Sequence, residues 1–142
     1  MRIRFAFGTL TLVADLLETP TAKAVAKVLP ITSSVLTWGD EVYFHVEVPA
    51  KREPDARRVV EPGEIAYWPE GHAIAIGFGR TPISLGTEIR LTAPCNVFAT
   101  ALSDVKALAK VKTGTKVTVT AVDDSDAASR GRRMASWWPS RS

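Results

Sequence analysis

The stretch VVEPGEIAYWPEGHAIAIGFGRTPIS, from Val59 to Ser84, contains two short apolar segments separated by turn residues. Residues 65–68 and 73–77 are predicted to be adjacent strands, because apolar and aromatic residues favour extended structure. Residues 69–71 (Pro-Glu-Gly) predict the bend between them, and residues 79–82 (Gly-Arg-Thr-Pro) end the second strand. The stretch therefore predicts a strand pair with aromatic and basic side chains at its ends, where loops usually carry binding groups.

Apolar residues alternate with other residues in several segments on both sides of this stretch. This alternation predicts further strands at residues 3–7, 10–14, 31–38, 42–48, 96–102 and 117–121, with a short extended piece at 87–92. One helix is predicted to begin with Thr19 as its cap and to end at Pro30, and a second, shorter helix to begin at Ser103. These are eight main strands and two short helices. A closed eight-stranded antiparallel barrel, capped by the helices, is expected because closure removes exposed sheet edges.

The composition fits a soluble globular protein of 142 residues, with 46% hydrophobic and 23% charged residues. No apolar run approaches the roughly 20 residues that span a bilayer, so no membrane partner is expected. The N-terminal segment alternates apolar with polar residues, unlike a signal peptide, which favours a cytoplasmic protein. The formal charge is +3, but it would be −1 without the arginines at 130, 132, 133 and 141. A nucleic-acid partner is therefore not expected.

Two polar stretches are predicted to lie outside the regular structure. The segment DDSDAASRGRRMASWWPSRS, residues 123–142, has no hydrophobic periodicity and predicts a disordered basic tail. Its pair Trp137-Trp138 is unusual there, and docking of the pair on the domain or on a partner is the alternative. The run PAKREPDARR, residues 49–58, carries both signs of charge and predicts a solvated loop, with anion binding as the alternative.

Few residues offer catalytic or metal-binding chemistry. Cys95 is the single cysteine, which excludes an intrachain disulfide and a thiolate metal cluster, and a buried inert thiol is expected rather than a nucleophile. The two histidines, His45 and His72, belong to no HxH or HExxH motif, so no metal site is predicted. The sequence also contains no nucleophile elbow, P-loop or dinucleotide fingerprint. No cofactor is expected, and catalytic residues stay unassigned.

Three segments together resemble the small prokaryotic cyclophilin-like proteins, which are short stand-alone bacterial and archaeal domains. They are TWGDEVYFHVEV (37–48), PGEIAYWPEGHAIAIGFGRTPIS (62–84) and NVFATALSDVKALAKVKTGTKVTV (96–119). The resemblance implies the eight-stranded cyclophilin-like barrel with a helix at each end, in agreement with the strand count. It predicts one cyclophilin-like barrel at residues 1–122, followed by the tail at 123–142.

The resemblance raises peptidyl-prolyl cis-trans isomerase activity, which is the activity of true cyclophilins. In those enzymes an arginine that follows a Phe-His pair polarises the prolyl amide, whose resonance gives a barrier of about 18–20 kcal/mol. Here Phe44-His45 is followed by Val46, and residues 73–76 (Ala-Ile-Ala-Ile) replace the Asn, Gln and Phe residues of the family. A weak isomerase that uses Arg80, Arg90 or a backbone donor is therefore an alternative function.

The favoured prediction is an aromatic groove that binds a peptide segment or a small-molecule ligand without established catalysis. Its expected residues are Trp38, Glu41, Tyr43, His45, Trp68, His72, Phe78 and Arg80. The aromatic residues have a structural alternative, because rings beside turn glycines commonly plug barrel ends. Related barrels resemble parts of amidohydrolase-type complexes, so a subunit or regulator with a larger protein partner is a further alternative.

Overall fold

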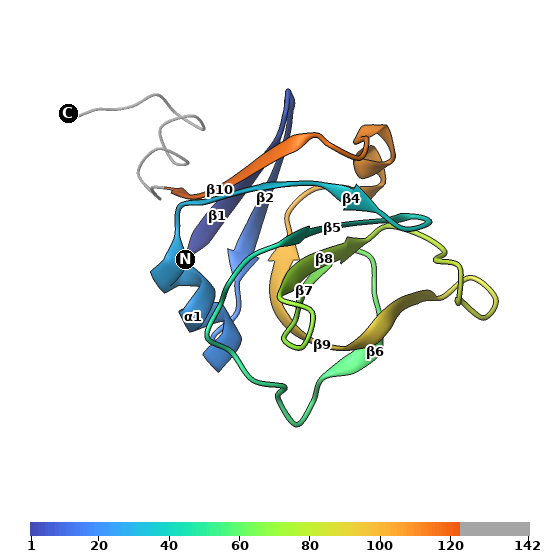
Figure 1. The fold of residues 1–142 in the computed structure, drawn as a ribbon, viewed down its shortest axis with the longest axis horizontal. Coiled ribbons are helices and arrows are strands. Elements are labelled where there is room, and N and C mark those ends of the chain that lie inside the picture. The colour runs from blue at the N-terminus through green and yellow to red at the C-terminus, as the bar shows by residue number, and fades with distance from the viewer. Residues whose placement is uncertain (123–142) are drawn as a thin grey trace.

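Residues 1–122 form ten strands, one α-helix and one 3-10 helix in the computed structural model, which describes this part of the chain (Figure 1). The strands are β1 (Arg2–Phe7), β2 (Leu10–Leu16), β3 (Ile31–Ser34), β4 (Leu36–Thr37), β5 (Glu41–His45), β6 (Arg57–Val60), β7 (Glu64–Trp68), β8 (Ala73–Gly77), β9 (Ile89–Ala101) and β10 (Lys116–Val122). Helix α1 spans Pro20–Val28 and the 3-10 helix η1 spans Val105–Lys110. None of the helices in this range is long and apolar enough to cross a membrane. The predicted tail, with Trp137-Trp138, lies outside the described residues.

All strand pairs are antiparallel, and the hydrogen-bonded path runs β3-β10-β1-β2-β9-β7-β8-β5-β4, with β6 paired to β9. This path has two ends, so the expectation of a closed eight-stranded barrel is wrong. The two end strands, β3 and β4, follow one another in the chain with only Val35 between them. They pair with β10 and β5 respectively, and the sheet therefore wraps around a core without a closing ladder.

The strand boundaries differ from the predictions where long-range pairing overrides local pattern. The predicted strand 31–38 is divided at Val35, whose side chain is fully buried. The segments 87–92 and 96–102 join into the single 13-residue strand β9. Residues 57–60 form β6 by pairing with β9, although 49–58 was predicted to be a loop throughout. Each difference depends on a partner strand distant in sequence, which periodicity alone does not reveal.

The first helix is as predicted, and the second is not an α-helix. Thr19 caps α1 by accepting a hydrogen bond at its hydroxyl from the backbone N–H of Ala22, 3.1 Å away. Residues Ala22 and Val25 are buried on the inner face of α1. The second predicted helix is the short 3-10 helix η1, and its N-terminal cap is Asp104 rather than the predicted Ser103.

The main core lies on one face of the wrapped sheet. Along β5, Val42 and Phe44 point into it, while Tyr43 points to the opposite face, as the period of a strand requires. The rings of Phe5, Phe7 and Phe44 lie within 6.3 Å of one another by centroid distance. Residues 49–56, which have no regular structure, are tied down by the buried amide of Asn96, which accepts from the Glu53 N–H and donates to the Lys51 carbonyl.

A second, smaller apolar cluster lies on the other face of β7 and β8. Its buried members are Val60, Ala66, Ala75, Ile89, Leu91 and Cys95. The C-terminal part of β9 pairs with β7 and β2, whereas its N-terminal part pairs with β6 and packs over this face. The long strand β9 curves visibly in Figure 1. It therefore covers a sheet face that would otherwise be exposed, and this cover creates the site described next.

Candidate ligand-binding pocket

A pocket of about 200 Å³ lies between the outer face of the sheet and the N-terminal half of β9. Its lining is predominantly aromatic and apolar, with one carboxyl group. The residues are Trp38, Glu41, Tyr43, Trp68, Ala73, Ala75, Leu91, Thr92 and Cys95. Most of the lining thus comes from regular strands, which hold their side chains more rigidly than loops do.

The pocket exists because β8 presents very small residues to the covering strand. Ala73 and Ala75 line it from β8. Gly77 is the next residue of β8 on the same face of the sheet. The covering strand β9 contacts β8 there so closely that a Cβ at Gly77 would overlap Ile89 Cγ2. The contact at Gly77 closes one end, and the missing side-chain volume at Ala73 and Ala75 leaves the space open.

Glu41 is the polar group of this pocket that stands out. It is the first residue of β5, pairs with Gly77 of β8, and is only 4% exposed. Within residues 1–122 its Oε1 atom has no hydrogen-bond partner. Burial raises the pKa of Glu41 from 4.5 to about 7, because a buried carboxylate loses its hydration. At neutral pH this carboxyl group can therefore either donate or accept a proton.

Glu41 and Trp38 are positioned by a tight turn that is anchored to the loop after β8. The N–H of Trp38 donates to the carbonyl of Glu41 across the turn. The turn is tied to the loop by two further bonds, from the Asp40 N–H to the Arg80 carbonyl and from the Phe78 N–H to the Asp40 carbonyl, each 2.8 Å long. The backbone of the turn that carries Glu41 is therefore held both within the turn and by the loop after β8.

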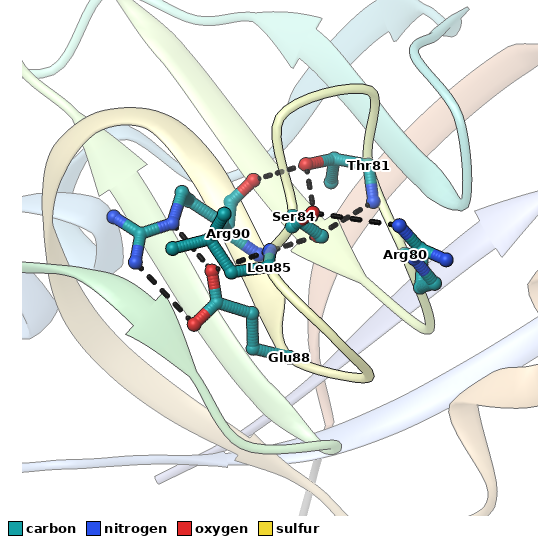
Figure 2. Close-up of polar contacts among 6 residues, drawn as sticks. All are labelled: Arg80, Thr81, Ser84, Leu85, Glu88 and Arg90. Carbon is teal, nitrogen blue, oxygen red and sulfur yellow. Dashed lines mark hydrogen bonds and ion pairs between the residues drawn. The ribbon is translucent and has the colours of Figure 1, made fainter.

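Figure 2 shows how that loop is held in turn. The Thr81 N–H donates to Ser84 Oγ at 2.9 Å, and the Thr81 hydroxyl donates to the Arg90 carbonyl at the start of β9. The Arg90 side chain forms an ion pair with Glu88, which lowers the pKa of Glu88. The Arg80 guanidinium points to the Ser84 carbonyl, with Nη2 3.5 Å away. Both arginines considered for isomerase chemistry are thus directed to this loop, and neither lines the pocket.

Four of the eight predicted site residues lie together in the pocket: Trp38, Glu41, Tyr43 and Trp68. The other four do not line it. His45 is exposed, with its ring 6.5 Å from that of Tyr43, and His72 is exposed with Nδ1 3.7 Å from the Glu47 carboxylate. Phe78 packs against the main core and borders a separate depression, while Arg80 is exposed in its loop.

Sequence reasoning missed the small residues of the pocket and its cover. The series Ala73, Ala75 and Gly77 at alternate positions of β8 was a signal for space on one sheet face. Leu91 and Cys95 could not have been assigned, because they reach the pocket through the curvature of β9. Burial, followed by the negative charges of Glu41 and Glu70, raises the pKa of Cys95 to about 12. This thiol is protonated at neutral pH, in agreement with the expected inert cysteine.

The described residues contain no group of three or more His, Cys, Asp or Glu side chains arranged to hold a metal ion. The pocket combines the Glu41 carboxyl group with an aromatic lining that offers flat apolar contact surface. The arrangement favours binding of a small molecule or a single side chain.

The sequence matches the cyclophilin-like family over residues 1–120. The chain belongs to the cyclophilin-like family. This confirms the resemblance inferred from the three segments of sequence. Among solved structures, this cyclophilin-like chain is similar to the hypothetical protein AF2241 from Archaeoglobus fulgidus, with 38% identity and a TM-score of 0.74. The match covers 86% of this chain and 95% of the archaeal chain.

A more distant likeness shows the fold alone. The structure of McbB in complex with tryptophan matches with 17% identity and a TM-score of 0.55. It covers 86% of the cyclophilin-like chain and 46% of McbB, so this chain spans about half the length of that protein. No curated protein matches the sequence.

Proposed function

We propose that this cyclophilin-like domain binds a small organic ligand, or one side chain of a peptide, in the pocket lined by Trp38, Glu41, Tyr43 and Trp68. The observation that carries the proposal is the buried carboxyl group of Glu41, whose Oε1 has no partner within the described chain and which lines an apolar pocket. A buried polar atom without a hydrogen bond costs free energy. A ligand that supplies the missing partner regains that free energy.

The size of the pocket restricts the ligand. Pockets for drug-sized molecules occupy about 300–1,000 Å³, whereas this one occupies about 200 Å³. It accommodates a small ring or one side chain, and an extended peptide would place only one residue inside. The proposal therefore narrows the predicted groove to a pocket for a single group.

Prolyl isomerase activity is less well supported than binding. A proline ring suits an aromatic pocket, but polarisation of the prolyl amide needs a donor, and the lining contains no arginine. Arg80 and Arg90 are engaged with Ser84 and Glu88. A role as subunit of a larger complex remains a separate proposal, which copurification would address.

The test is a two-dimensional NMR screen of a fragment panel and of an Xaa-Pro tetrapeptide, followed at the tryptophan indole signals. Single Trp→Phe variants assign the signals of the four tryptophans. Ala75→Leu fills the pocket, and Ala121→Leu makes the same change at an exposed position of β10. Saturable shifts at Trp38 and Trp68 in the wild type and in Ala121→Leu, but not in Ala75→Leu, are expected.

Two results would change this view. If no compound shifts either indole signal, the pocket is not a ligand site and the proposal fails. If the tetrapeptide also exchanges its cis and trans forms faster in the presence of protein, the domain is an isomerase rather than a binding module.

A further inference from the structure

The charge balance inside the pocket points to the chemical class of the ligand. Glu41 is the one lining residue with a carboxyl group, and the lining contains no Lys, Arg or His. The other titratable groups that face the pocket are the phenol of Tyr43 on β5 and the thiol of Cys95 on β9. When Glu41 is ionised, the pocket is therefore negative and has no internal counter-charge.

The ionised Glu41 carboxylate is destabilised because it has no counter-charge, and a bound cation would remove this destabilisation. Burying an ionised carboxylate without a partner is unfavourable, and the protein responds by keeping Glu41 partly protonated near neutral pH. Desolvation by burial is the cause of the raised pKa of Glu41. The Arg52–Glu70 ion pair lies outside the lining and acts on Cys95 with both signs of charge. An anionic ligand would add a second negative charge, so the pocket selects against carboxylates and phosphates.

The aromatic lining also favours a cationic group on the ligand. The faces of Trp and Tyr rings carry negative electrostatic potential and attract ammonium cations. Two tryptophans and a tyrosine line the same small space as the carboxylate. We infer that the ligand carries a cationic amine, which binds the Glu41 carboxylate among the rings of Trp38, Tyr43 and Trp68. This inference rests on the ligand pocket proposed above.

This amine can belong to a free small molecule or to a lysine side chain. The small volume and the enclosure by β9 favour a compact free amine. Three probes of similar shape separate charge from shape: 2-phenylethylamine is cationic, 2-phenylethanol is neutral and phenylacetate is anionic. Nα-acetyl-lysine methylamide, as a fourth probe, represents the lysine source.

The experiment is titration of each probe into the full-length protein, followed at the Trp38 and Trp68 indole signals. We expect 2-phenylethylamine to bind at least about tenfold more tightly than 2-phenylethanol, and phenylacetate to show no saturation. Glu41→Gln should remove the preference for the amine. The matched control Glu47→Gln, at a side chain that is 87% exposed, should retain it.

The pH dependence provides a second readout. Affinity for 2-phenylethylamine should rise about tenfold between about pH 6 and pH 8, as Glu41 becomes ionised, and should be nearly flat in Glu41→Gln. A neutral ligand that accepts a hydrogen bond from protonated Glu41 would show the opposite trend and would overturn the inference. The raised pKa of Cys95 keeps its thiol protonated in this range.

The possible failures are distinct. If 2-phenylethanol or phenylacetate saturates the pocket as tightly as the amine, the inference of a cationic ligand is overturned, while the proposed binding function stands. If fragments of the panel bind but the amine does not, the same conclusion follows. If no probe or fragment binds, both proposals fail. Tighter binding of the lysine derivative than of 2-phenylethylamine would identify a peptide as the source of the amine.

Discussion

Replacing Glu41 with glutamine should remove a large part of the pH dependence of stability between about pH 5 and pH 8. Glu41 is 4% exposed, and burial raises its pKa in the folded protein to about 7, compared with an ordinary value of 4.5. Between these two values the folded state keeps a proton that the unfolded state has released. The free energy of unfolding therefore falls as the pH rises from about 4.5 to about 7, and levels off above.

The magnitude follows from the two pKa values. Each pKa unit corresponds to about 1.4 kcal/mol, so the full effect of Glu41 is about 3 kcal/mol at high pH. Between about pH 5 and pH 8 the expected loss from this one group is about 2–3 kcal/mol. The loss is large compared with the total stability of about 5–15 kcal/mol that is typical of small domains.

The assay is urea unfolding of the wild type and of Glu41→Gln at several pH values, followed by circular dichroism. Glutamine cannot ionise. The free energy of unfolding of Glu41→Gln, relative to that of the wild type, should therefore increase by about 2–3 kcal/mol between about pH 5 and pH 8. The comparison between two pH values cancels any constant effect of the new amide group. Glu47→Gln, at an exposed position, should follow the wild type.

Parallel pH profiles for the wild type and Glu41→Gln would refute the reasoning. They would mean that the folded protein leaves Glu41 as well hydrated as the unfolded chain does. The inference of a cationic ligand would then lose its support from the cost of burying this charge.

Three further predictions concern the residues that support the pocket and the core. Tyr67→Phe should lower the free energy of unfolding by about 1–3 kcal/mol, because the buried phenol donates to the Val46 carbonyl and accepts from the Val48 N–H; an unchanged urea midpoint would contradict this. Gly71→Ala should displace the Trp68 indole, since the new Cβ would overlap the ring, and should shift the Trp68 indole signal; a spectrum identical to the wild type would show that the turn adapts instead. Asn96→Ala should expose residues 49–56 to limited proteolysis, because the hydrogen bonds of the Asn96 side-chain amide to Glu53, Lys51 and Thr21 are lost. Equal cleavage rates in the variant and the wild type would mean that other contacts hold this loop in place.

Local patterns in the sequence predicted most of the elements. The alternation of apolar residues located β1, β2 and β10, apolar segments bounded by turn residues located β7 and β8, and Thr19-Pro20 marked the start of α1. These features depend on neighbours within a few residues, so the sequence contains the information directly. The segments of the cyclophilin-like resemblance identified the family for the same reason, since they are continuous stretches of chain.

The candidate site was predicted only in part, and the division has a physical reason. Trp38, Glu41 and Tyr43 are close in sequence around one turn, and Trp68 ends the strand that the sequence already paired with residues 73–77. His45 occupies the same face of β5 as Glu41 and Tyr43, yet it is exposed while Glu41 is buried. Nothing in the local pattern distinguishes the two positions.

The sequence by itself determined the strand-rich fold class and the first helix. The tertiary structure alone decided that the sheet path stays open, that β9 is one long strand, and that its first half covers β8. That cover removes water from Glu41 and leaves its Oε1 without a partner in the described chain. Burial of a side chain depends on contacts between segments far apart in sequence, and for this reason an ordinary glutamate of the sequence becomes the distinctive group of the folded protein.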